Sequence, residues 1–174
     1  NEGDIFGASI SLSADGRLVA IGAPYRATNG NYRSGEVYFY EDRGFEPAEW
    51  IESRARLSGS NKEDYFGWSV SLGSEGDYVA IGAPINQEES RPGYVRTYKY
   101  TGIDDKWEQL GQDIIGDDDG DRYGFSVSMD GFGGKVAVGA YRGHSGRGKA
   151  VIYSLQGSKW KPIGGHLLGM SDEN

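Results

Sequence analysis

Hydrophobic and hydroxyl-bearing side chains alternate along three short segments of this chain. A period of two places the two kinds of side chain on opposite faces of a β-strand. One face then carries bulky groups and the other only serine-sized groups, as expected for an innermost strand where several sheets crowd around an axis. The bulky positions are Ala8, Ile10 and Leu12, then Trp68, Val70 and Leu72, then Phe125, Val127 and Met129.

Each alternating segment is followed by three further predicted strands. A short turn, such as Asp15-Gly16, is a strong hairpin signal and leads to an apolar run that predicts a strand covered on both faces. Pro24 and Pro84 end this second strand, because proline cannot donate to a strand ladder. A variable loop then precedes a third strand, and a tryptophan begins a fourth, more polar one. The third strands open at Gly35, Gly93 and Gly148, and the fourth at Trp50, Trp107 and Trp160.

This order of elements occurs three times. The copies begin at Asp4, Asp64 and Asp121, which lie 60 and 57 residues apart. Self-similarity at a long, nearly constant period indicates a stacked or circular array of one supersecondary unit. We therefore expect one segment over residues 1–174 with units at about 4–63, 64–120 and 121–174.

Two short motifs within each copy resemble the FG-GAP repeat of the integrin α-subunit β-propeller and of related propellers in secreted proteins. The first motif is Phe6-Gly7, Phe66-Gly67 and Tyr123-Gly124, and the second is Gly22-Ala23-Pro24 and Gly82-Ala83-Pro84, with Gly139-Ala140-Tyr141 as a partial match. The resemblance implies an all-β fold, a β-propeller of four-stranded antiparallel blades with three blades in this chain. It also implies an extracellular interaction module without chemistry of its own, which meets its ligands on the rim formed by the loops after strands two and four.

Composition narrows the classes of function. The chain carries 26 acidic and 18 basic residues, for a net charge of −8, and lacks the basic stripe that a nucleic-acid backbone requires. It contains no cysteine, so thiol chemistry is excluded. No stretch approaches the ~20 apolar residues of a membrane-spanning helix. The chain begins at Asn1 without a methionine or a signal peptide, so we expect a processed product or a piece of something longer.

Metal binding and catalysis have weak candidates. Four carboxylates, Asp117, Asp118, Asp119 and Asp121, could hold calcium, but a solvated turn between blades is the favoured interpretation. The hairpins between strands one and two lack the Asp-rich calcium loop of many FG-GAP repeats, so we expect no cofactor. Asp4, Asp64 and Asp121 recur before each FG pair, and we expect them to cap the turn by accepting backbone N–H bonds. His144 and His166 lack the partners of a nucleophilic site, and we expect no enzymatic activity.

The loops after the second strands are the predicted ligand-binding surface. Tyrosine and arginine anchor interfaces, although exposed variable loops need no function. The candidates are Tyr25, Arg26, Tyr32, Arg33, Arg91, Arg142, His144 and Arg147. The repeated tryptophans could form a carbohydrate-binding series, but their fixed position favours packing between blades.

Three functions stay open from sequence. The first is an extracellular adhesion or recognition module that binds a protein or glycan, without nucleic acid and without membrane insertion. The second is a structural repeat that builds an oligomer or filament, and the third is an accessory propeller of a secreted hydrolase. Closed propellers have about four to eight blades, so three blades leave two sheet faces open. We therefore expect further blades, from the parent chain or from another copy, to cover them.

Overall fold

The computed structural model describes residues 3–44, 47, 49–84 and 92–170 of the chain. This part of the chain consists of fifteen β-strands joined by turns and loops, and contains no helix. It accordingly holds no helix that could cross a lipid bilayer. The all-β prediction is confirmed.

The strands form three antiparallel sheets of the same design, which we call blades 1, 2 and 3. The first, second and third strands of each blade follow in sheet order, and the outer edge is lined by two short strands. Blade 1 holds β1 (Ser9–Leu12), β2 (Leu18–Ala23), β3 (Glu36–Asp42), β4 (Trp50–Glu52) and β5 (Leu57–Ser58). Blade 2 holds β6 (Ser69–Leu72), β7 (Tyr78–Ala83), β8 (Tyr94–Tyr100), β9 (Trp107–Gln109) and β10 (Ile114–Ile115). Blade 3 holds β11 (Ser126–Met129), β12 (Lys135–Ala140), β13 (Lys149–Gln156), β14 (Lys159–Pro162) and β15 (Leu167–Leu168).

The fourth strand of each blade is interrupted, which the sequence pattern does not reveal. In blade 1, β4 and β5 both pair with β3. In the same way, β9 and β10 both pair with β8, and β14 and β15 both pair with β13. Within the interruption, one backbone N–H still bonds to the third strand, as Leu110 does to Thr97 at 2.8 Å. The two short strands at the outer edge of each blade therefore act as one fourth strand with a bulge. The prediction of four-stranded blades is confirmed.

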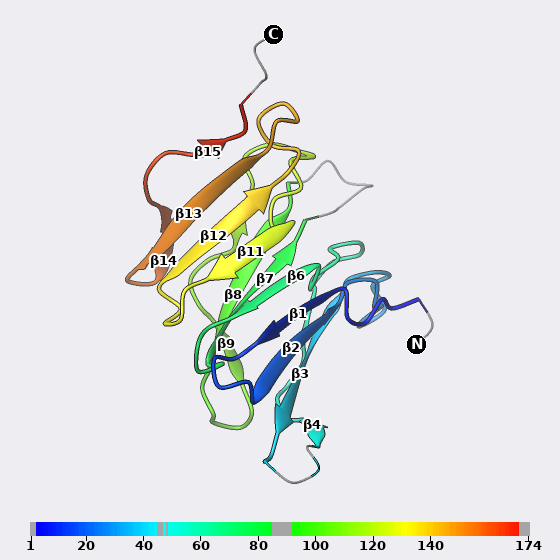
Figure 1. Cartoon of the computed structure of the whole chain (residues 1–174). Coiled ribbons are helices and arrows are strands. Elements are labelled where there is room, and N and C mark those ends of the chain that lie inside the picture. Colours follow the sequence, from blue (N-terminus) through cyan, green and yellow to red (C-terminus); the bar gives the residue numbers. More distant parts are fainter. Residues whose placement is uncertain (1–2, 45–46, 48, 85–91, 171–174) are drawn as a thin grey trace.

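The blades stand side by side in chain order, with their first strands adjacent. Figure 1 shows blade 1 (blue to cyan), blade 2 (green) and blade 3 (yellow to orange) fanned so that β1, β6 and β11 lie next to one another. The outer strands β4 and β14 lie away from this shared edge. This is the arrangement of three consecutive blades of a β-propeller.

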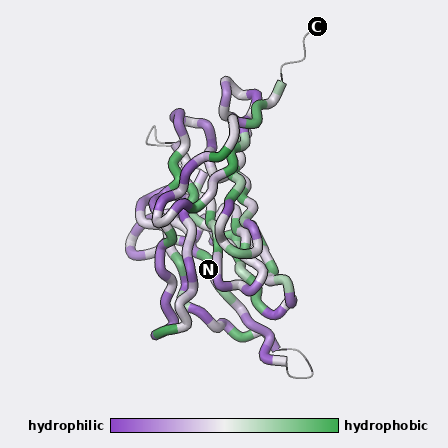
Figure 2. Tube along the Cα trace, turned by 90° about the vertical axis from the view of Figure 1, so that its left-hand side faces the viewer, coloured by the Kyte–Doolittle hydropathy of each residue, from purple (hydrophilic) through white to green (hydrophobic). Residues whose placement is uncertain are grey.

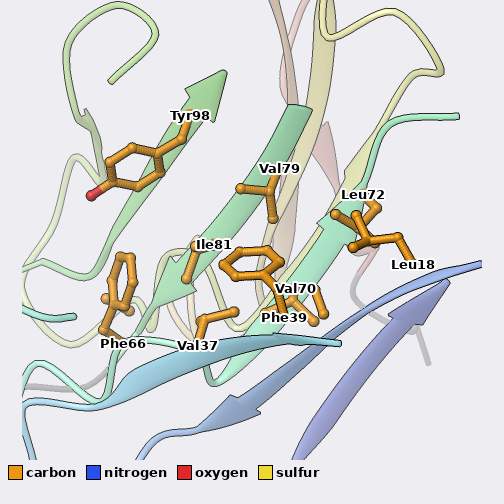
Figure 3. Close-up of a cluster of buried hydrophobic side chains, with 11 residues drawn as sticks. Leu18, Val37, Phe39, Phe66, Val70, Leu72, Val79, Ile81 and Tyr98 are labelled. Atoms are coloured by element: carbon orange, nitrogen blue, oxygen red, sulfur yellow. The ribbon is translucent and has the colours of Figure 1, made fainter. Parts of the chain in front are cut away.

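Two hydrophobic cores fill the spaces between the blades. The core between blades 1 and 2 includes Phe39 and Val37 from β3, which meet Val79 and Ile81 from β7 (Figure 3). The core between blades 2 and 3 includes Val95 from β8 and Val136 from β12. Hydrophobic (green) and hydrophilic (purple) residues are interleaved along the chain rather than gathered in long runs (Figure 2). Stability thus comes from burying each broad sheet face against the next blade.

The second strand is more completely buried in the middle blade, which is covered by a neighbouring blade on each face. β7 is buried on both faces, as its nearly continuous apolar sequence predicts, while β2 and β12 alternate between buried and half-buried or exposed residues. β2 and β7 end at Ala23 and Ala83, directly before the prolines. The predicted hairpin turns are present, with Gly16, Gly76 and Gly133 at positive φ.

Candidate ligand-binding site on the rim

Each first strand is preceded by a tight turn that contains the FG pair. Its first residue has left-handed backbone dihedrals, with φ of 52° for Ile5, 52° for Tyr65 and 61° for Arg122. The FG glycine also has a positive φ, 86° at Gly67, and a Cβ there would lie 3.0 Å from the carbonyl oxygen of Glu36. Only glycine accepts this combination without strain. The turn places the residue after the glycine on the rim, beside the end of the second strand.

A continuous row of aromatic rings crosses this rim from blade 1 to blade 3. Ring centroids are 5.0 Å apart for Tyr25 and Tyr65, 6.4 Å for Tyr65 and Trp68, 5.6 Å for Trp68 and Phe125, and 4.5 Å for Phe125 and Tyr141. We call these five residues the aromatic row. Edge-to-face and tilted ring pairs at such separations are attractive beyond their burial. The row is therefore preorganised, with the ring of Tyr65 buried and the other four rings half-buried or exposed.

A hollow of about 190 Å³ interrupts the rim between blades 1 and 2. It is lined by Ile5, Ala8, Pro24, Tyr25 and Trp68. Ala8 occupies the position that Trp68 and Phe125 occupy in the other two blades, directly after the FG glycine. A methyl group thus stands where the repeat elsewhere has a large ring, and the missing ring leaves the hollow open beside Trp68.

A cation lies beside the hollow. The guanidinium of Arg33 lies 4.9 Å from the centroid of the Tyr25 ring and 4.7 Å from that of Tyr32, and it donates a hydrogen bond of 3.3 Å to the hydroxyl of Tyr65. The hydrogen bond to Tyr65 leads the influences that raise the pKa of Arg33. Arg33 is therefore a fixed positive charge held over aromatic faces.

The other sequence candidates lie in different surroundings. Arg26 donates to Asp4 at 2.8 Å and lies 3.6 Å from Glu36, so it links two carboxylates of its own blade. Arg142 is exposed in the corresponding loop of blade 3, near the half-buried His144 and the exposed Arg147. Arg91 lies outside the described residues. The structure thus brings Tyr25, Tyr32 and Arg33 together and separates the blade 3 candidates from them.

The acidic cluster is organised around a lysine. The Nζ of Lys149 donates to Asp117 at 3.0 Å and pairs with Asp121, and the side chains of Lys149 and Asp121 are both buried. Burial alone would lower the pKa of Lys149, but the hydrogen bonds that it donates to Asp121 and Asp117 raise it. Asp118 and Asp119 line an open hollow with Arg142. The described residues hold no group of three or more acidic or histidine side chains suited to a metal ion.

The recurring aspartates before the FG pairs have different partners in the three blades. Asp64 accepts hydrogen bonds from the backbone N–H groups of Ser60 at 3.1 Å and Asn61 at 2.9 Å, which confirms the capping role at this position. Asp4 and Asp121 instead pair with Arg26 and Lys149. The difference follows from the third strand, where Tyr94 donates to Asp64 at 3.0 Å at the position that Lys149 occupies in blade 3.

Comparison with known proteins supports the repeat assignment. Residues 1–40 match the FG-GAP repeat family. The matched segment contains the FG turn, β1, β2 and most of β3 of blade 1, and it includes every residue that lines the hollow except Trp68. Curated protein sequences gave no match.

Solved structures agree on the fold. The chain is similar to a candidate 6-phosphogluconolactonase from Bacteroides uniformis, with a TM-score of 0.59 and 12% identity over 93% of this chain and 40% of that one. It is also similar to Sqt1 of Saccharomyces cerevisiae, with a TM-score of 0.58 and 12% identity over 94% of this chain and 35% of that one. The chain therefore spans about two fifths of the length of these proteins. At such identities the likeness concerns the fold alone.

Sequence reasoning overlooked most of the residues that line the hollow. The alternation predicts Ala8 and Trp68 on the bulky face of the inner strands, but the first strands begin one residue later and these side chains line the hollow on the rim. The signal was present in the aligned copies, since Ala8 is the small residue in a column otherwise filled by Trp68 and Phe125.

Proposed function

We propose that this chain is a non-enzymatic recognition module of an extracellular protein, and that its rim binds a protein or glycan ligand. The observation that carries the proposal is the hollow beside Trp68, with the aromatic row on one side and Arg33 nearby. Its extracellular location rests on the resemblance to FG-GAP repeats in secreted and cell-surface proteins.

The size of the hollow supports recognition of one ring or one side chain. Sites for drug-sized molecules usually have volumes of roughly 300–1,000 Å³, whereas this hollow measures about 190 Å³. A single sugar ring, or one apolar side chain of a protein ligand, matches that volume. Trp68 and Tyr25 line the hollow with aromatic rings, and the exposed Tyr32 beside Arg33 adds residue types that dominate binding energy at interfaces.

The surroundings of the ionisable groups give no support to a catalytic role. The strongest pKa perturbations belong to ion pairs and buried tyrosines that hold a blade together. Burial, for example, raises the pKa of the Tyr94 hydroxyl. Structural networks of this kind perturb pKa values without catalysis. The candidate lactonase among the similar structures shares the fold at 12% identity, which gives no reason to assign its activity to this chain.

The test replaces the missing ring. Ala8→Phe places at position 8 the same ring that Phe125 supplies in blade 3, and it should fill the hollow while leaving the fold intact. We would select binders of the native chain from a peptide phage library and a glycan microarray, and measure their affinities by biolayer interferometry. A weakening of at least about tenfold, equivalent to ~1.4 kcal/mol, is expected for Ala8→Phe.

Phe132→Ala is the matched control. Phe132 is an exposed aromatic residue in the hairpin between β11 and β12, at the end of the blade opposite the FG turns. Binders should bind this variant as they bind the native chain. If they bind Ala8→Phe equally well, or if neither library yields a binder, the rim hollow is not a recognition site.

A further inference from the structure

The two interfaces inside this chain use the same hydrogen bonds at equivalent positions. The Oγ of Ser9 in blade 1 donates to the carbonyl oxygen of Gly67 in blade 2 at 2.8 Å, and Ser69 in blade 2 donates to Gly124 in blade 3, also at 2.8 Å. The other serine of each inner strand accepts a bond instead: Ser11 Oγ from the N–H of Leu72, at 3.0 Å. Each serine face thus binds the FG turn and the first strand of the following blade.

The hairpin turns at the opposite end are joined in the same repeating manner. The N–H of Ala14 donates to the carbonyl oxygen of Ser74 at 2.8 Å, and the N–H of Ser74 donates to that of Gly131 at 2.9 Å. Equivalent residues therefore form a chain of backbone hydrogen bonds from blade to blade. The direction is constant, since the earlier blade always donates.

The tryptophans of the fourth strands point backwards along the same array. The Nε1 of Trp107 donates to Ala55 of blade 1 at 3.0 Å, and that of Trp160 donates to Leu110 of blade 2 at 2.8 Å. In both cases the acceptor lies in the interruption of the preceding blade's outer strand. These tryptophans therefore pack between blades, as their fixed position predicted.

The two ends of the array carry complementary unfilled halves of these contacts. On blade 3, the hydroxyls of Ser126 and Ser128 and the N–H of Gly131 have no hydrogen-bond partner among the described residues. On blade 1, Phe6 is 51% exposed, whereas its counterpart Phe66 is fully buried. Blade 3 thus carries serine hydroxyls and a backbone N–H, unpaired within the described part of the chain, on the face that a following blade would cover. Blade 1 carries an exposed FG turn on the face that a preceding blade would cover.

The side-chain sizes at the two ends also match. The open face of blade 1 carries bulky apolar groups, with Ile10 and Leu12 exposed at 61% and 56%, while the equivalent Val70 and Leu72 are buried against blade 1. Trp50 is likewise 44% exposed, and its counterpart Trp160 only 3%. The open face of blade 3 carries Ser126, Ser128, Ala137 and Gly139, as blade 1 presents Ser9, Ser11, Ala20 and Gly22 to blade 2.

We propose that two copies of this chain associate head to tail, the blade 3 face of each covering the blade 1 face of the other, and close into a ring. One such contact, four strands of about five residues at ~4.8 Å spacing, covers on the order of 300 Å² on each partner. A single contact therefore buries about 600 Å², below the ~1,000 Å² that a specific interface needs. The closed pair makes the contact twice and passes that threshold, which favours the ring over an open chain.

The first measurement is the mass in solution. Static light scattering on the purified chain should give about twice 18.9 kDa at high concentration and dissociation on dilution. Leu12→Glu places a charge in the blade 1 face, and Gly139→Ala adds a methyl group where the FG carbonyl of the next copy docks. Each should shift the association by at least tenfold in concentration. Ile103→Glu, an identical kind of change at a residue that is 70% exposed in the turn between β8 and β9, should have no effect.

The second measurement establishes which faces meet. Because the chain has no cysteine, single cysteines can be introduced cleanly. In the contact of Ser11 with Leu72, serine Oγ and the backbone nitrogen are 3.0 Å apart, so Ser128 of one copy and Leu12 of the other should lie within the ~4.4–6.8 Å Cα separation of a disulfide. Oxidation of a mixture of Leu12→Cys and Ser128→Cys should cross-link the two variants to each other.

The outcomes separate cleanly. Cross-links between unlike variants, and a dimer weakened at least tenfold by Leu12→Glu and by Gly139→Ala, support the closed pair. A chain that stays monomeric at the highest concentration reached would assign the faces to other occupants, such as further blades of a longer protein, and overturn the proposal. Cross-links between like variants, or a light-scattering mass above twice 18.9 kDa, would also overturn it.

Discussion

Glycines at the end of each second strand allow neighbouring blades to touch, and replacing one of them tests how the blades pack. A Cβ at Gly82 would lie 2.0 Å from the carbonyl oxygen of Gly124 in the next blade and 2.3 Å from Ser69 Oγ. Real Cβ contacts essentially never fall below 3.0 Å, so blades 2 and 3 would have to separate by about 1 Å. Because the interior is close-packed, this movement opens a gap along the whole core between them.

The expected cost of Gly82→Ala follows from two contributions. Overpacking costs about 1–3 kcal/mol, and disturbing the hydrogen bond from Ser69 to Gly124 costs about 1 kcal/mol more. We expect a loss of about 3 kcal/mol in the free energy of unfolding, and a fall in Tm of about 6–12 °C for a domain of this size. Urea denaturation followed by tryptophan fluorescence measures the first, and calorimetry the second.

Gly139→Ala is the matched control in blade 3. A Cβ there would clash with the Oγ of Ser126 at 2.2 Å, and its other nearest atoms, also in Ser126, lie at 3.6 Å or more; the hydroxyl can rotate away. In the Leu12→Glu background, which keeps the chain monomeric, Gly139→Ala should change stability by less than about 1 kcal/mol. Equal effects of Gly82→Ala and Gly139→Ala would refute the packing of blade on blade through these glycines.

Three further predictions concern single contacts, each measured by urea denaturation. Lys149→Met leaves Asp121 buried without its cation and should cost about 3 kcal/mol, part of which Asp121→Asn restores; an unchanged stability would contradict the buried pair. Burial opposes ionisation of Asp4, but the hydrogen bond from Arg26 lowers the pKa of Asp4. The pair therefore stabilises the fold above pH ~4, and this stabilisation is lost as the pH falls through the folded pKa. The loss of unfolding free energy caused by Arg26→Met at pH 7 should shrink at pH 3, and an equal loss at both pH values would refute the linkage. Trp160→Phe removes an indole N–H bonded between blades and should cost about 2 kcal/mol, with a value near zero counting against that contact.

Repetition made the strands predictable from sequence, but it did not predict the contacts that differ from one blade to the next. Three copies in phase located every first, second and third strand, because turn residues and alternation reinforce one another. The interruption of the fourth strand was not predictable, since in blades 1 and 2 it accommodates the tryptophan of the next blade. The partner of Asp121 was equally hidden, because Lys149 is distant in sequence and its position holds Glu36 and Tyr94 in the other blades. Contacts between repeats depend on differences among the copies, which a shared pattern obscures.

The hollow and the open faces meet at one residue, Ala8, and this makes the two proposals separable. In the ring, the rim beside Phe125 of one copy would meet Ala8 of the other, as Trp68 meets Phe125 within the chain at 5.6 Å. A phenylalanine at position 8 would therefore fill the hollow between blades 1 and 2 and would gain a ring contact with Phe125 of the partner copy. Ala8→Phe should weaken ligand capture at least about tenfold while leaving dimerisation intact or stronger, whereas Leu12→Glu should dissociate the dimer and leave the hollow unchanged. If Ala8→Phe instead dissociated the dimer, the inner strands of the two copies could not be arranged like those of consecutive blades.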